Sequence, residues 1–418
     1  MSRLIVIIAA GSRGDIQPCV ALGQGLAARG DKVRLVASGR YEPMVTGARL
    51  EFTALTADPT EILTSDEGQE WLAGGRNPVK FIRNFKRIIG PMAERLLTEA
   101  LAACQGADLL LTPTIGFFGE HVGEHLDIPR VLIHFQPSQP TGEFPHPLLP
   151  QGRLLGRTGN RLSFSLVDQV AWQLLRPFIN PWRQRSLGLA KLPLLGPMRR
   201  VRRDERPVLC CFSEAVVPRP ADWPPYVHTT GYWFVDAASD WAPPQELADF
   251  LAAGPPPAYV GFGSMVPKNP AETDAIVRAA LRQAGVRGIL AGAPETAPRD
   301  EDVLVVSDVP HAWLFPRMAA VVHHGGAGTT AAGLRAGVPT IICPFFGDQP
   351  YWGERVAALG AGPKPLPVKE LTVGGLAAAI TQAVHSESVR SAAARVGERI
   401  SAEDGVAAAC DVLSPPKG

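Results

Sequence analysis

Two histidines, three glycines and two threonines crowd into residues 323–330, "HHGGAGTT", directly after the apolar pair Val321-Val322. Glycines let a backbone approach a ligand closely, and the free N–H groups at the start of a helix favour an anion. A histidine at the end of the preceding strand adds a donor for phosphate oxygens. The motif therefore predicts a phosphate cradle. A tight strand–helix turn with one buried histidine remains the alternative interpretation.

Two further loops carry side chains that suit sugar chemistry. "PFFGDQPYW" (344–352) places Asp348 beside Gln349, and their donors and acceptors suit adjacent hydroxyl groups of a sugar. On its own, such an Asp is equally typical of a helix N-cap. "AAGSRGDIQP" (9–18) places Asp15 at the start of a predicted helix. A carboxylate there can serve as general base for an incoming hydroxyl, or simply complement the helix dipole.

Several other chemistries are disfavoured by missing motifs. The first strand–helix turn holds Gly11 and Gly14 without a complete G-x-G-x-x-G, which argues against a nicotinamide or flavin oxidoreductase. The chain contains no G-x-x-x-x-G-K-[ST] phosphate loop. A zinc site at His323-His324 lacks an HExxH motif or a cysteine pair to complete it. We therefore expect neither a bound metal nor a resident cofactor.

The elements that must position these loops follow an alternating strand–helix rhythm. "LIVIIAA" is a short continuous apolar run, typical of a buried parallel strand. The other strands are predicted at 32–38, 107–113, 129–135, 256–264, 287–292, 302–308, 319–326 and 339–345. Helices are predicted after the first turn, at 271–285, up to about Leu334 and from about 375 to 412. We predict an α/β protein with two Rossmann-like, doubly wound domains facing a cleft.

Composition supports this plan. With 418 residues, 46 % of them hydrophobic, the chain can bury two cores. Its net charge of +1 gives no support for a nucleic-acid partner. The six cysteines form no CxxC and are expected to be reduced thiols. The N-terminal apolar run is too short for a signal sequence, and no stretch reaches the ~18–20 apolar residues of a membrane span. We expect a soluble, cytoplasmic protein.

The domain boundaries are predicted from a change in amino-acid composition and periodicity along the chain. The segment 216–245 is dense in Pro and Trp and lacks periodicity, which is typical of a linker. We predict an N-terminal domain at 1–215 and a C-terminal domain at 246–395. Residues 396–418 are predicted as a helix that packs back on the N-terminal domain.

Four motifs together resemble one family. "GSRGDIQP", "GFGSM", "VPHAWLFPRMAAVVHHGGAGTT" and "PFFGDQPYWGERVAALGAGP" occur in this order over residues 11 to 363. The chain resembles the inverting nucleotide-sugar glycosyltransferases of the UGT type, which have the GT-B fold. It is most similar to bacterial antibiotic and macrolide glycosyltransferases and to sterol or lipid glucosyltransferases. The resemblance implies transfer of a hexosyl group, with glucose as the expected sugar, from a UDP- or TDP-sugar to an apolar small-molecule acceptor.

The resemblance implies that the domain at 1–215 binds the acceptor and that the domain at 246–395 binds the nucleotide sugar. It also implies roles for individual residues. Asp15 matches the catalytic base. The expected donor-binding residues are Arg13, Gly14, Ser264, Val309, His311, His323, Gly325, Gly326, Gly328, Thr329, Asp348 and Gln349. Among them, His323 and the glycine turn match the diphosphate contacts, Ser264 the hydroxyl of the GS turn, and 309–311 the segment whose backbone reads the base. Asp348 and Gln349 match the pair that holds the sugar hydroxyls.

Two departures affect the nucleotide. The plant-type pattern has a tryptophan that stacks on uracil where this chain has Asp308, and a ribose-binding glutamate where it has Ala331. Both departures leave the choice between UDP and TDP donors open.

The acceptor region is the least informative part of the chain. Segments 60–95 and 137–190 lack a clear strand–helix rhythm but contain aromatic residues. We predict an apolar acceptor pocket lined by Phe81, Phe85, Phe117, Phe118 and Phe144, with ordinary core packing as the alternative for each. The basic stretches 79–90 and 198–206 suit either a weak peripheral contact with an anionic membrane or a solvated surface.

Three alternative classes remain. One is a GT-B enzyme of another reaction, such as an epimerase or a retaining transferase, and the pairing of "HHGGAGTT" with the later "DQP" argues against it. Another is a lipid-targeted enzyme that works at a membrane surface. The last is a non-catalytic nucleotide-sugar-binding helper of a partner transferase, which would be expected to lack Asp15 or the Asp348-Gln349 pair. Both features are present.

Overall fold

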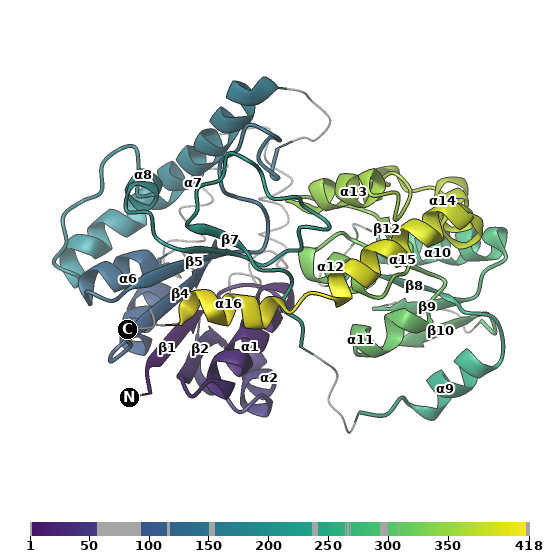
Figure 1. Ribbon diagram of the computed structural model, residues 1–418. Helices are drawn as coiled ribbons and strands as arrows, with labels where there is room; N and C mark the ends of the chain where they lie inside the picture. Colours follow the sequence, from purple (N-terminus) through teal and green to yellow (C-terminus); the bar gives the residue numbers. More distant parts are fainter. Residues whose placement is uncertain are drawn as a thin grey trace.

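The chain forms two parallel sheets, each flanked by helices (Figure 1). The computed structural model describes residues 2–56, 93–114, 118–149, 155–235, 241–263, 265, 267, 269–292, 300–307 and 309–414. The first sheet has seven strands in the order β3-β2-β1-β4-β5-β6-β7, and the second has five in the order β10-β9-β8-β11-β12. This confirms the prediction of two doubly wound α/β domains.

The first domain is built around β1, whose residues Ile5 to Ile8 are fully buried. Its elements are β1 (Leu4–Ile8), α1 (Arg13–Ala28), β2 (Lys32–Ser38), α2 (Glu42–Gly47), β3 (Glu51–Leu55), β4 (Leu109–Pro113), α6 (Gly119–His125), β5 (Arg130–His134), α7 (Gly156–Ser186), α8 (Met198–Arg203), β6 (Val208–Cys210) and β7 (Val227–Thr229). β1 pairs in parallel with β2 on one side and β4 on the other. Helices cover both faces because all strands run the same way.

In the second domain, the strand order of the sheet reverses beside the glycine motif 325–328. Its elements are α9 (Gln245–Ala252), β8 (Ala258–Gly261), α10 (Pro270–Ala284), β9 (Gly288–Ala291), β10 (Val303–Val306), α11 (His311–Leu314), β11 (Ala320–His323), α12 (Ala327–Arg335), β12 (Thr340–Ile342), α13 (Gln349–Ala358), α14 (Val373–His385) and α15 (Glu387–Ser401). The strand order reverses between β8 and β11, where His323 lies opposite Gly261. Ligands of such sheets bind beyond the carboxyl ends of the strands at this point.

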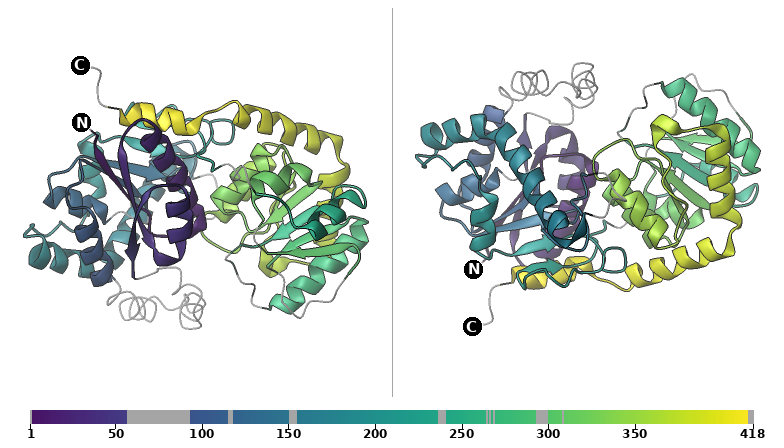
Figure 2. Two further views of the ribbon diagram at one scale, coloured as in Figure 1. Left: turned by 90° about the horizontal axis from the view of Figure 1, so that it is seen from below. Right: turned by 90° about the horizontal axis from the view of Figure 1, so that it is seen from above.

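The chain crosses between the domains twice. The first sheet extends to Thr229, so the first part of the predicted linker 216–245 belongs to the N-terminal domain. At the other end, α15 packs against α12 of the second domain, whereas α16 (Gly405–Leu413) packs against α1 of the first. Arg29 and Asp411 form an ion pair of 2.6 Å there. The C-terminal helices thus run along one side of both domains (Figure 2).

The longest helix in the described part of the chain, α7, lies in a segment where no strand–helix rhythm is apparent. It continues through Pro177 and Pro181, which ordinarily disfavour a helix interior. Buried Trp172 and Trp182 anchor it to the first domain. None of the helices in the described part of the chain has the length and apolar character needed to cross a membrane.

Candidate functional site

His323 is the last residue of β11 and is fully buried. The backbone N–H of Gly325 donates a hydrogen bond of 3.0 Å to its Nδ1, so the ring proton must sit on Nε2. Burial lowers the pKa of His323 well below its ordinary value, and the neighbouring His324 and His311 lower it further. Nε2 is buried and has no partner among the described residues. The result is a neutral N–H donor that lacks an acceptor.

The glycines after His323 are required by close packing. Gly325 has φ of +91°, and a Cβ there would lie 2.6 Å from Ile342. Gly326 is the N-cap of α12, and a Cβ there would lie 2.5 Å from Nε2 of His324. The His324 ring also lies against Gly263 after β8, where a Cβ would be 3.1 Å from Cε1. His324 therefore fills the space between the two glycine turns, and its buried Nδ1, like Nε2 of His323, has no partner among the described residues.

Two helices from different domains begin at this place. Gly14 and Gly328 are the second residues of α1 and α12, and a Cβ on Gly328 would lie 3.8 Å from the Cα of Gly14. Each helix start carries partial positive charge and free N–H groups. Together with the Nε2–H of His323, they make a setting that favours an anion.

Asp15 is the third residue of α1 and forms a capping box with Ser12. Its Oδ2 accepts hydrogen bonds from the backbone N–H of Ser12 at 2.8 Å and from its hydroxyl at 3.0 Å. Burial raises the pKa of Asp15, and the bonds from Ser12 oppose that shift. No hydrogen bond reaches Oδ1 from the residues that the structure describes. One oxygen thus anchors the helix start, while the other is free to take a proton.

Asp348 and Gln349 stand at the start of α13. Oδ2 of Asp348 accepts a hydrogen bond of 2.8 Å from the Trp352 indole, one helical turn later. Burial raises the pKa of Asp348 to about 6, the hydrogen bond from the Trp352 indole opposes this shift, and the charge of Asp15 adds to it. Oε1 of Gln349 accepts from the backbone N–H groups of Phe345 and Phe346 at 2.7 and 3.2 Å. The amide N–H₂ of Gln349 is then its remaining group for a ligand.

The other residues expected to contact the donor occupy different environments. The ring of His311 stacks on Phe315 at 4.3 Å, and its Nε2 lies 3.4 Å from the Tyr259 hydroxyl, so this side chain packs into its own domain. Val309 directly precedes that turn. Thr329 lies in the first turn of α12, and Arg13 is the exposed first residue of α1. Ser264 and Asp308 lie outside the described residues.

The predicted acceptor aromatics separate into different environments. Phe118 is 6 % exposed and belongs to the core that includes Ile8 and Val122, as the alternative interpretation holds. Phe144 is half-buried, with ring centroids 6.4 Å from Phe164 of α7 and 5.9 Å from Tyr351 of α13. It therefore bridges the two domains. Phe81, Phe85, Phe117 and the basic stretch 79–90 lie outside the described residues.

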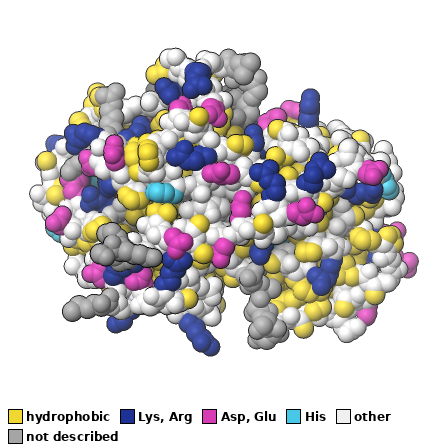
Figure 3. Space-filling view, in the orientation of Figure 1, with side chains coloured by type: hydrophobic (Ala, Val, Ile, Leu, Met, Phe, Trp, Pro, Cys, Tyr) yellow, Lys and Arg dark blue, Asp and Glu magenta, His cyan; other side chains and the backbone are white. Residues whose placement is uncertain are grey.

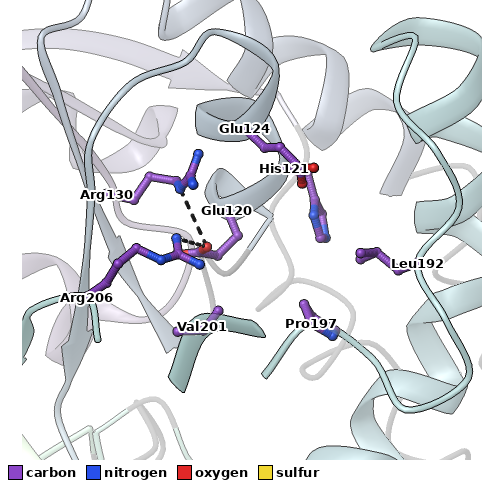
Figure 4. A pocket seen from close by; sticks show the side chains of 8 residues that line it. All are labelled: Glu120, His121, Glu124, Arg130, Leu192, Pro197, Val201 and Arg206. Atoms are coloured by element: carbon purple, nitrogen blue, oxygen red, sulfur yellow. Dashed lines mark hydrogen bonds and ion pairs between the residues drawn. The ribbon is translucent and has the colours of Figure 1, made fainter. Parts of the chain in front are cut away.

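A small cavity between α6, β5 and α8 was not apparent from the sequence (Figure 4). Glu120 pairs there with Arg206 at 2.5 Å and with Arg130 at 3.7 Å, and the ring of His121 points into the same space. The volume of about 20 Å³ is room for roughly one water molecule. The cavity beside this buried ion cluster is too small to hold a sugar or an apolar acceptor.

Trp352 and Ser12 are site residues that sequence reasoning missed. The sequence spacing of each residue could have indicated its role. Trp352 follows Asp348 by four residues on one helix, and Ser12 precedes Asp15 by three in the spacing of a capping box.

Two family models match the chain. The glycosyltransferase family 28 N-terminal domain matches residues 5–112. The C-terminal domain of erythromycin biosynthesis protein CIII-like proteins matches residues 265–409. The second match covers the glycine turn, the start of α13 and His323.

Curated relatives cover almost the whole chain. Sterol 3-beta-glucosyltransferase UGT80A2 of Arabidopsis thaliana is 37 % identical over 97 % of this chain and 64 % of its own length. A sterol 3-beta-glucosyltransferase of Neosartorya fischeri is 36 % identical over 99 % of this chain and 29 % of its own. The chain thus spans less than two thirds of these relatives.

Solved structures share the fold. The glycosyltransferase of kitacinnamycin superposes with a TM-score of 0.72 at 19 % identity, covering 99 % of this chain and 98 % of its own. SsfS6 from Streptomyces sp. SF2575, complexed with thymidine diphosphate, gives a TM-score of 0.62 at 22 % identity and covers 99 % and 100 %. At these identities the likeness establishes the two-domain fold alone.

Proposed function

The chain belongs to the GT-B glycosyltransferases of the UGT type, and on that premise we propose that it is an inverting glycosyltransferase. It moves a hexosyl group, with glucose as the expected sugar, from a UDP- or TDP-sugar to a hydroxyl of an apolar acceptor such as a sterol, lipid or natural product. The observation that carries the proposal is the buried Nε2–H of His323, which has no partner among the described residues and lies where α1 and α12 begin. The sterol-glucosylating relatives support the acceptor class.

The diphosphate is the group that this arrangement suits best. A neutral imidazole donates through Nε2–H at any pH above its lowered pKa, so its hydrogen bond does not depend on protonation. The amides at the starts of both helices add fixed partial positive charge. In this proposal protein dipoles, with no metal ion and no resident cofactor, stabilise the charge that develops on the leaving group.

The proposed reaction is a single in-line displacement. The acceptor oxygen forms a bond to the anomeric carbon while the bond from that carbon to the phosphate oxygen breaks. The acceptor proton passes to Oδ1 of Asp15, and the nucleoside diphosphate leaves from the opposite face with inversion of configuration. The capping box supports this role, because Ser12 holds Oδ2 and so fixes the direction of Oδ1.

Asp348 and Gln349 are proposed to hold the hydroxyls of the donor sugar. Asp348 accepts through its carboxylate, which the Trp352 indole orients. Gln349 donates through its amide, since its oxygen is already engaged by the loop 345–346. We assign no residue to the ribose of the donor, because Ala331 is 3 % exposed and has no polar side-chain group.

The test is nucleoside diphosphate release from UDP-glucose and TDP-glucose in the presence of EDTA, with sterol, macrolide and phenolic acceptors. Acceptor-dependent release that gives the inverted glycoside is the expected result. Tight donor binding without turnover on any acceptor would instead favour the helper-protein alternative.

A further inference from the structure

The cavity between α6, β5 and α8 contains charged side chains that are largely removed from solvent. On the face of the molecule shown in Figure 3, Lys and Arg side chains are interspersed with Asp and Glu side chains at the surface, where water solvates them. Glu120 and Arg206, by contrast, expose only 5 % and 16 % of their side chains and form an ion pair. Arg130 lies 3.7 Å from the same carboxylate oxygen, Oε2 of Glu120. Because burying charged groups is costly, their remaining polar atoms need hydrogen-bond partners.

His121 adds a neutral hydrogen-bond donor to this cavity. Its side chain is 1 % exposed, and Nη1 of Arg183 lies 3.1 Å from its Nδ1. A guanidinium can only donate, so Nδ1 of His121 accepts and carries no proton. Burial, together with the charge of Arg183, lowers the pKa of His121 to about 3. The proton of the neutral ring therefore sits on Nε2.

Three polar atoms of the residues that line the cavity have no hydrogen-bond partner within the described part of the chain. They are Nε2 of His121, Oε1 of Glu120 and Nε of Arg206, and all three are buried. The set comprises two N–H donors and one carboxylate acceptor. Figure 4 shows the ring of His121 directed into the space that Glu120 and Arg206 border from the other side.

We propose that this cavity binds one ordered water molecule, which accepts hydrogen bonds from His121 and Arg206 and donates one to Glu120. The cavity volume of about 20 Å³ exceeds the ~10–15 Å³ that one water molecule requires. Buried waters typically make about three hydrogen bonds to polar groups that lack other partners. We call the place bordered by Glu120, His121 and Arg206 the α6 water site.

The mixture of donors and an acceptor selects water over an ion. A halide ion can only accept, so the carboxylate oxygen of Glu120 would face it with like charge. A metal cation needs lone pairs, whereas His121 and Arg206 present N–H groups and Arg130 adds positive charge. Among the described residues, no group of three or more His, Cys, Asp or Glu could hold a metal ion. Water alone of the three both accepts and donates.

The α6 water site would join segments that are distant in the sequence. Glu120 and His121 lie on α6, whereas Arg206 precedes β6. Through Arg183, the same network reaches the C-terminal part of α7. The bound water thus completes a polar connection among the helices on one side of the first domain. This inference is independent of the proposed transferase reaction, because the site uses neither a donor nor an acceptor.

The direct test is a high-resolution crystal structure of the full chain, from crystals grown with and without sodium bromide. We expect an electron-density peak within hydrogen-bond distance of Nε2 of His121 and Oε1 of Glu120, with no anomalous bromide signal there. A site without such a peak would overturn the proposal. A bromide signal at the site would also overturn it and assign the cavity to a halide ion.

A second test uses the sign of a stability change. Val201 of α8 lines the cavity and is 5 % exposed. Val201→Ile adds one methyl group, which should displace the water and leave the three polar atoms without partners. Urea denaturation should then show an unfolding equilibrium constant raised about tenfold. Filling a dry cavity would instead stabilise the fold, so a lowered unfolding constant for Val201→Ile would overturn the proposal.

The matched control is Val305→Ile, which makes the same change at a 44 % exposed valine on β10 of the second domain. Its unfolding equilibrium constant should stay within about twofold of the wild-type value. The crystal structure of Val201→Ile should lack the density peak at the α6 water site, whereas that of Val305→Ile should retain it.

Discussion

Gly14 and Gly328 face each other across the domain boundary, and a Cβ on Gly328 would lie 3.8 Å from the Cα of Gly14. Each is the second residue of its helix. Because glycine has only a hydrogen atom as its side chain, the two helix starts can approach each other closely. The proposed diphosphate site depends on this approach, because each helix contributes its partial charge only within its first turn.

Gly328→Leu is expected to separate the two helix starts. Its side chain would extend past Gly14, and the KM for the donor should rise about tenfold with little loss of stability. The matched control is Gly374→Leu, at the second position of α14, where nothing lies within 4 Å of an added Cβ. Steady-state kinetics check this prediction. Equal donor KM values for both variants would show that the approach of the helices does not matter.

His323→Ala should remove the neutral donor and lower turnover by roughly 10²–10³-fold, the range found when one donor to a developing anion is lost. His323→Gln should recover part of the activity, since its amide can donate from a position near Nε2. A kcat/KM for His323→Ala close to the wild-type value would contradict the diphosphate role.

Protonation of Asp348 should weaken donor binding at low pH and so cause the acidic limb of the activity–pH profile. Because its pKa is raised to about 6, the carboxylate becomes protonated as the pH falls through that value, and the donor KM should rise. Asp348→Asn keeps an acceptor for the Trp352 indole but removes the charge. The variant should show a donor KM raised about tenfold and no acidic limb near pH 6. Persistence of that limb in the variant would assign it to another group.

Buried histidines should make the protein sensitive to acid. Burial lowers the pKa of His121 to about 3 and of His134 and His146 to about 4. The unfolded chain then binds more protons below its ordinary histidine pKa, so the free energy of unfolding should fall as pH drops from about 6.5 to about 4. The raised pKa of Asp348 acts in the opposite direction over part of this range.

His146→Asn isolates one contribution to this acid sensitivity. Nδ1 of His146 accepts a hydrogen bond of 3.1 Å from the backbone N–H of Leu148, and the Asn oxygen can accept the same bond. Between pH 7.5 and 5, urea denaturation should show a loss of stability smaller by about 1–2 kcal/mol than in the wild type. An identical loss in both proteins would mean that His146 is protonated in the folded state.

The strands were predictable because continuous apolar runs such as Leu4 to Ile8 are typical of buried parallel sheets. α7 was not, since its exposed leucines obscure the amphipathic pattern and two prolines interrupt it. The short strand β7 follows a Pro-rich segment that is typical of a linker. Its place in the sheet depends on pairing with β6, which no local pattern reveals.

In the candidate site, the sequence motifs pointed to Asp15 and His323 as candidates, but they did not show which atoms of these side chains are available to a ligand. The proton of His323 is assigned by the amide of Gly325, and the orientation of Gln349 by the loop 345–346. The meeting of Gly14 with Gly328 requires both domains in place. Such relations arise from tertiary contacts between segments that are far apart in the sequence.

The most direct test of the central claim compares Asp15→Asn with Ser12→Ala. Asparagine can still accept from Ser12 and preserve the capping box, but it cannot take the acceptor proton. Ser12→Ala keeps the carboxylate and removes one bond that lowers its pKa, so it should stay active with a base that titrates at higher pH.

We would measure donor affinity by calorimetry and acceptor-dependent nucleoside diphosphate release for both variants. The account predicts that Asp15→Asn binds the donor like the wild type and loses about 10²–10⁴-fold in kcat. An Asp15→Asn protein that turns over at a rate close to the wild type would contradict the account and assign proton removal to another group.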